Sequence, residues 1–105
     1  MASDIDIVEG WDEPFDEQLL ADGVARNITG ATVAFLVYGR NEVLATHTGT
    51  ASITTAATGL VRYAPVAGEF TAANSPYGYR WRVTLGGKVS YHPNKGTARL
   101  IVRKP

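Results

Sequence analysis

Short runs of β-branched and aromatic residues, separated by Gly, Asn and Pro, make up most of this chain of 105 residues. The clearest run covers residues 77–85, where Tyr, Trp, Val and Leu hold the odd positions and Gly, Arg and Thr the even ones. Strict alternation with a period of two predicts a strand with one apolar face. The same reasoning predicts strands over residues 5–9, 15–20, 31–38, 42–48, 51–54, 60–64, 77–85, 88–92 and 97–103.

Turn signals divide these strands, and helix signals are nearly absent. Pro14 and the Asp-Gly pair at 22–23 shorten the one helical candidate, residues 13–21. Seven or eight short strands drawn from these nine stretches, with a turn about every 8–12 residues, are typical of a two-layer antiparallel sandwich. We therefore predict an all-β, immunoglobulin-like antiparallel β-sandwich, in which Tyr77 or Tyr79 is placed to form a corner hydrogen bond.

Length and composition narrow the class of protein further. A mass of 11.3 kDa predicts one domain over residues 1–105, and 45% hydrophobic residues can fill its core. The absence of cysteine excludes disulfides, zinc ribbons and thiol catalysis. No apolar run approaches the roughly 20 residues of a membrane span, and the acidic N-terminus does not resemble a secretory signal. We expect no membrane partner.

Charge is separated along the chain, although ten basic and ten acidic residues give a net charge of zero. Eight carboxylates lie in the first 25 residues, and all the basic residues lie from Arg26 onward, so the two parts carry −8 and +8. This predicts an acidic N-terminal segment, with residues 1–12 as a candidate arm, that pairs with a basic sheet within one copy or between copies. A separable arm would leave the domain folded when it is deleted.

The interface candidates follow from this separation. They are Asp4, Asp6, Glu9, Trp11 and Asp12 in the arm, and Arg62, Arg80, Arg82, Arg99 and Arg103 on the basic face. A large aromatic such as Trp11 in an acidic segment is expected to be buried against its own domain or against another subunit. The basic face is either an ordinary solvated surface or a docking site for an acidic protein. Zero net charge argues against nucleic acid.

Reactive side chains do not converge in the sequence. His47 and His92 lie far apart and lack partners at metal or catalytic spacing. The acidic positions do not follow a calcium loop, no G-x-S-x-G motif occurs, and Gly86-Gly87-Lys88 lacks the spacing of a phosphate loop. We therefore expect no enzyme activity, no metal and no cofactor.

Several stretches share a pattern with a known family. Residues 27–37 read Asn-Ile-Thr-Gly-Ala-Thr-Val-Ala-Phe-Leu-Val, residues 58–63 read Thr-Gly-Leu-Val-Arg-Tyr, and residues 77–83 read Tyr-Gly-Tyr-Arg-Trp-Arg-Val. With residues 89–96 and 100–102, they resemble phage immunoglobulin-like domains, among them the N-terminal domain family of the siphophage baseplate upper protein. The acidic start takes the place of that family's first strands. The resemblance implies a scaffolding role in a multi-subunit particle and no catalytic residues.

These observations predict a non-enzymatic structural protein of a bacteriophage virion, in the tail, in the baseplate or associated with the capsid. It would assemble in the host cytoplasm, dock to other virion proteins and be present in many copies or as a homo-oligomer. The alternative is a small carbohydrate-binding or adhesion module. In that case Tyr63, Tyr91 or Trp11 would be exposed and would stack on sugar rings.

Overall fold

The computed structural model of the chain describes residues 4–21, 23–39, 47–65, 68–93 and 97–104. Strands dominate these residues, and the helices among them are two single turns of 3₁₀ type, η1 (Ala56–Thr58) and η2 (Ala72–Asn74). No helix in this described part is long and apolar enough to cross a membrane. The predicted all-β class is confirmed.

Most strands fall close to the predicted runs, but the short hairpin of β3 and β4 was not predicted. They are β1 (Ile5–Val8), β2 (Phe15–Gln18), β3 (Leu20–Ala21), β4 (Val24–Ala25), β5 (Thr32–Tyr38), β6 (His47–Thr55), β7 (Leu60–Tyr63), β8 (Tyr77–Leu85), β9 (Lys88–His92) and β10 (Ala98–Arg103). The separate strands predicted at 42–48 and 51–54 are wrong, because residues 47–55 form one strand. The hairpin expected at Arg40-Asn41 lies outside the described residues.

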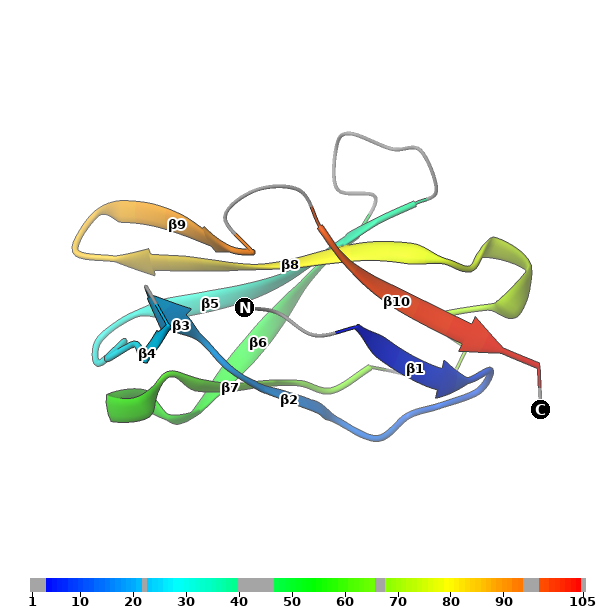
Figure 1. Cartoon of the computed structure of the whole chain (residues 1–105), viewed down its shortest axis with the longest axis horizontal. Coiled ribbons are helices and arrows are strands. Elements are labelled where there is room, and N and C mark those ends of the chain that lie inside the picture. Colours follow the sequence, from blue (N-terminus) through cyan, green and yellow to red (C-terminus); the bar gives the residue numbers. More distant parts are fainter. Residues whose placement is uncertain (1–3, 22, 40–46, 66–67, 94–96, 105) are drawn as a thin grey trace.

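The main sheet follows the order β1-β10-β8-β5-β6-β7-β2, with β9 beside β8, and β3 and β4 form a separate hairpin. β6 connects two layers: its first half pairs with β5, and its second half pairs with β7 across an irregularity between Ile53 and Thr55. Figure 1 shows β6 running diagonally from the level of β8 to the level of β7 and β2. A strand that changes layer in this way curls the sheet over its own apolar face.

The sheet is mixed, which corrects the expectation of a purely antiparallel arrangement. β1 runs parallel to β10, with Ile5 opposite Leu100 and Ile7 opposite Val102. This register places Ile7, which is 4% exposed, in the core. Residues 5–8 are therefore a strand of the sheet and, within the described residues, part of the domain rather than of a detached arm.

Aromatic rings join the two layers. Phe35 of β5 lies at the centre, with its ring centroid 4.5 Å from that of Tyr63 on β7 and 4.7 Å from that of Trp81 on β8. Tyr79 of β8 stacks on the same ring at 5.2 Å. Each pair adds about 0.5–1.5 kcal/mol beyond the area that it buries. The odd positions of β8 face this core, as the alternation predicts.

Candidate functional site

Asp4, just before β1, and Asp6, within it, pair with basic residues of β10 in the same chain. Because Ile5 and Ile7 point inward, Asp4 and Asp6 point outward. The Asp4 carboxylate lies 3.0 Å from Nη2 of Arg99 and also accepts a hydrogen bond from the Arg99 backbone N–H. Asp6 accepts hydrogen bonds from Nε and Nη2 of Arg103, both at 2.9 Å. The hydrogen bonds from Arg103 hold the pKa of Asp6 below its usual value.

A third pair of this kind lies at the other end of the sheet. Asp16 of β2 is directly opposite Arg62 of β7. The guanidinium donates to both carboxylate oxygens, at 2.6 and 3.0 Å, and these bonds lower the pKa of Asp16. Three of the five predicted basic-face arginines are thus neutralised by aspartates of their own chain. These three are Arg62, Arg99 and Arg103.

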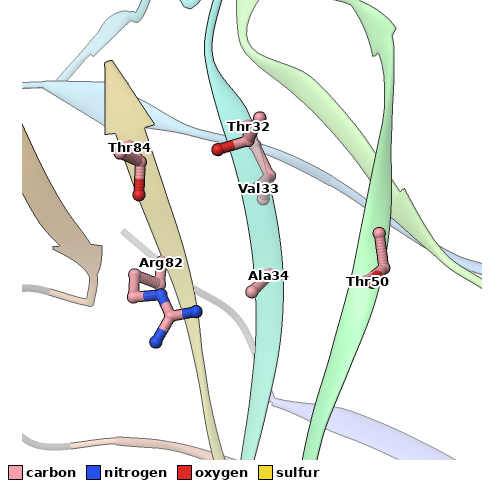
Figure 2. A pocket seen from close by; sticks show the side chains of 6 residues that line it. All are labelled: Thr32, Val33, Ala34, Thr50, Arg82 and Thr84. Carbon is pink, nitrogen blue, oxygen red and sulfur yellow. The ribbon is translucent and has the colours of Figure 1, made fainter. Parts of the chain in front are cut away.

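The remaining two arginines lie together on the outer face of β8. Arg80 donates through Nε to the carbonyl of Pro93, and its guanidinium carbon lies 4.2 Å from the centre of the Tyr91 ring. Arg82 has no hydrogen bond or ion pair with the described residues. It lines a shallow depression together with Thr32, Ala34, Thr50 and Thr84, as Figure 2 shows.

Trp11 lies in the turn between β1 and β2, and it is 37% exposed. Its indole N–H donates to the carbonyl of Glu13 at 2.8 Å, and its backbone N–H donates to the carbonyl of Val8. Its own domain therefore leaves the ring partly exposed, and burial against another subunit stays a prediction. Glu9, in the same turn, accepts a hydrogen bond from the backbone N–H of Ala72 at 2.9 Å.

Two hydrogen bonds between a tyrosine and a glutamate could not be predicted from the spacing of residues along the chain. The hydroxyl of Tyr79 donates to Glu17 at 2.9 Å, and the hydroxyl of Tyr63 donates to Glu69 at 2.6 Å. Burial raises the pKa of Glu17 and of both tyrosines. The indole N–H of Trp81 also lowers the pKa of Glu17, although its geometry falls short of a hydrogen bond. One local signal pointed to the burial of Glu17: it lies two residues after Phe15 on the same strand, so both side chains face the core.

The two histidines lie in different clusters. Nε2 of His47 is 3.3 Å from both the Tyr63 hydroxyl and the Glu69 carboxylate. Burial and the Glu69 carboxylate raise the pKa of Tyr63, which disfavours the ionised form of this phenol. The cluster connects β6 to the loop after β7. Nε2 of His92 lies 2.8 Å from Arg26, and burial together with that cation lowers its pKa.

The described residues contain no group of three or more His, Cys, Asp or Glu side chains that could hold a metal ion. Tyr63, which was expected to be exposed in a carbohydrate-binding module, is 6% exposed and belongs to the core. Neither protein-family models nor curated proteins nor solved structures gave a match to this chain.

Proposed function

We propose that the chain is a non-enzymatic structural protein of a bacteriophage particle, placed in the tail, in the baseplate or next to the capsid, and that it works by docking to other proteins in a multi-copy assembly. The resemblance of residues 27–37 and 77–83 to phage immunoglobulin-like domains supports this assignment. The curled all-β sheet is compatible with such a domain.

The finer description, an immunoglobulin-like sandwich, belongs to the same proposal. Two observations support it. β6 changes from one layer to the other, as strands at the corner of a sandwich do. Tyr77 accepts a hydrogen bond of 3.0 Å from the backbone N–H of Thr71, six residues upstream, which is similar to the tyrosine corner of such domains.

One observation carries the docking role: the turn between β1 and β2 presents Trp11 beside two unpaired carboxylates. Asp12 and Glu13 are exposed, and neither carboxylate forms an ion pair with the described residues. We call Trp11, Asp12 and Glu13 the acidic turn. Tryptophan is enriched among the residues that dominate binding energy in protein interfaces. An exposed indole next to two free carboxylates therefore fits a contact with a basic or mixed partner surface.

The test compares two single variants of exposed apolar residues. Trp11→Ser removes the ring of the acidic turn, and Val24→Ser alters a residue that is 68% exposed on the β3–β4 hairpin. Each variant, carried by the phage that encodes the chain, is followed into purified particles by quantitative mass spectrometry. We expect the wild type and Val24→Ser in many copies per particle, and Trp11→Ser in at least about fivefold lower amount. Absence of the wild-type chain from particles would overturn the proposal.

Of the three aromatic candidates of the carbohydrate-binding alternative, Trp11 is the one with an uncovered exposed ring in the described structure. Tyr63 is buried, and the Tyr91 ring is covered on one face by Arg80, which leaves Trp11. A saturable change in tryptophan fluorescence with a member of a glycan panel, lost in Trp11→Ser, would replace the docking proposal with this alternative.

A further inference from the structure

We propose that the depression around Arg82 is a carboxylate-binding site, and that its occupant is the acidic turn of a second copy of this chain. The inference rests on the proposed docking function and names the partner. It assigns a receptor surface to the outer face of β8, β5 and β6 and a ligand segment to the turn between β1 and β2.

The hollow arises from small residues at the centre of three paired strands. Ala34 of β5 lies opposite Arg82 of β8 on one side and opposite Thr50 of β6 on the other. Thr32 lies opposite Thr84 in the neighbouring row. The methyl group of Ala34 leaves a depression of about 190 Å³ between the longer side chains. Figure 2 shows the Arg82 guanidinium at its edge, with the hydroxyl groups of Thr32 and Thr84 nearby.

Arg82 differs from the other arginines of the basic face. Arg62, Arg99 and Arg103 each hold an aspartate of the same chain. Arg82 forms no such pair with the described residues, and no aspartate or glutamate lines its depression. A planar guanidinium binds a carboxylate through two parallel hydrogen bonds, and threonine hydroxyls can supply further donors. The site is therefore suited to a side-chain carboxylate.

The acidic turn is the complementary surface on the same chain. Asp4, Asp6 and Asp16 are engaged with arginines, whereas the carboxylates of Asp12 and Glu13 have no partner among the described residues. Among the described residues, unpaired carboxylates are thus exposed at this turn, and an unpaired arginine lies on the outer face of β8. Opposite charges on two different patches favour association between copies.

The two patches belong to different parts of the fold, so that one copy can present both. In Figure 1 the turn that follows β1 lies at the lower right, and the β8–β9 hairpin lies at the upper left. A contact between two different patches is heterologous, and it repeats from copy to copy as a ring or an open chain. Such repetition is what a multi-copy particle component needs.

The test uses charge reversal and complementation in the full-length chain. Arg82→Glu removes the receptor, and the double variant Asp12→Lys with Glu13→Lys removes the ligand. Lys104→Glu is the matched control, because it makes the same charge change at an exposed cation that does not line the depression. Sedimentation velocity measures the average mass over a concentration series at low and high salt.

We expect wild type and Lys104→Glu to self-associate, and the association to weaken at high salt. Arg82→Glu and the lysine double variant should each associate about tenfold more weakly or worse. Their equimolar mixture should form a complex, because the intact acidic turn of one meets the intact depression of the other. Isotope-labelled lysine double variant should then show chemical-shift changes at Thr32, Thr50 and Thr84.

Two results would overturn the inference. One is a wild-type chain that stays monomeric at millimolar concentration, and the other is Arg82→Glu associating as the wild type does. Mass spectrometry of purified particles distinguishes a failure of this inference from a failure of the proposed function. If Arg82→Glu enters particles at the wild-type level, this depression is not the receptor, yet the chain is still a particle component. If the wild-type chain is absent from particles, the proposed function fails.

Discussion

The Tyr79 hydroxyl donates a hydrogen bond of 2.9 Å to the Glu17 carboxylate, and this bond joins the two layers of the curled sheet. Tyr79 lies on β8 and is fully buried, whereas Glu17 lies on the edge strand β2. Sixty-two positions of sequence separate them. Burial raises the pKa of the Glu17 carboxyl, and the bond from Tyr79 partly offsets that increase.

Removing this hydrogen bond is expected to destabilise the fold. In Tyr79→Phe the carboxylate keeps its burial but loses its donor, which should cost about 1–3 kcal/mol of the free energy of unfolding. Tyr91→Phe is the matched control, because the Tyr91 hydroxyl has no hydrogen bond among the described residues. Urea unfolding measures both variants. Equal stability of the two would show that the bond between the layers contributes nothing.

Glu17 and Asp16 are neighbours with opposite pH dependence. The raised pKa of Glu17 makes its contribution to stability largest at low pH, and that contribution is lost as the pH rises through the folded-state pKa. The lowered pKa of Asp16 gives stability above the unfolded-state value, which is lost as the pH falls. Relative to wild type, Glu17→Gln should therefore become more stable to heat between pH 3 and pH 7. Asp16→Asn should become less stable to heat, relative to wild type, over the same range.

Melting temperatures at several pH values check this pair of variants. The amide oxygen introduced by Glu17→Gln remains an acceptor for the Tyr79 hydroxyl, so the difference from wild type isolates the charge. For each variant, the difference in melting temperature from wild type is plotted against pH. If the two differences change in the same direction as the pH rises, the assigned environments of these carboxyl groups are contradicted.

Ile7 and Val8 test whether residues 5–8 belong to the sheet. Ile7 is 4% exposed and packs in the core, while Val8 is 43% exposed. Ile7→Ala should therefore cost about 2–4 kcal/mol, and Val8→Ala less than about 0.5 kcal/mol. Chemical denaturation distinguishes the two outcomes. A small effect of both substitutions would restore the picture of a separable arm.

Position 49 of β6 requires a glycine because the Tyr63 ring packs directly against it. A Cβ atom at this position would overlap the Tyr63 ring, which is held in the core against Phe35. Gly49→Ala should destabilise the chain by about 1–3 kcal/mol. In a Tyr63→Leu background the added cost should be clearly smaller, because the overlapping atoms are gone. An unchanged cost in that background would place the strain elsewhere.

The acidic turn could be recognised in part from the sequence. Trp11 is conspicuous among acidic residues, and alternation correctly places Asp4 and Asp6 on the face opposite Ile5 and Ile7. The pairing of these aspartates could not be predicted, because it depends on β1 lying parallel to β10, about 95 residues later in the chain. The exposure of Trp11 likewise follows from a local hydrogen bond to Glu13.

The Arg82 depression, too, could be predicted from the sequence only in part. The alternation of residues 77–85 places Arg82 on the outer face, since side chains on successive residues point to opposite sides of a strand. That Ala34 lies beside it and leaves a hollow depends on the register of β5 with β8 and β6. A shift of one residue would place Val33 or Phe35 there instead.

The local pattern of the chain determined most of its strands, its apolar faces and the separation of its charges, because each of these depends on neighbouring residues. Tertiary structure alone decided which charges meet. Three aspartates form ion pairs with arginines on a neighbouring strand. Asp12, Glu13 and Arg82 form no ion pair with the described residues. Strand order and register fix such distances, and neither is encoded in the spacing of residues along one strand.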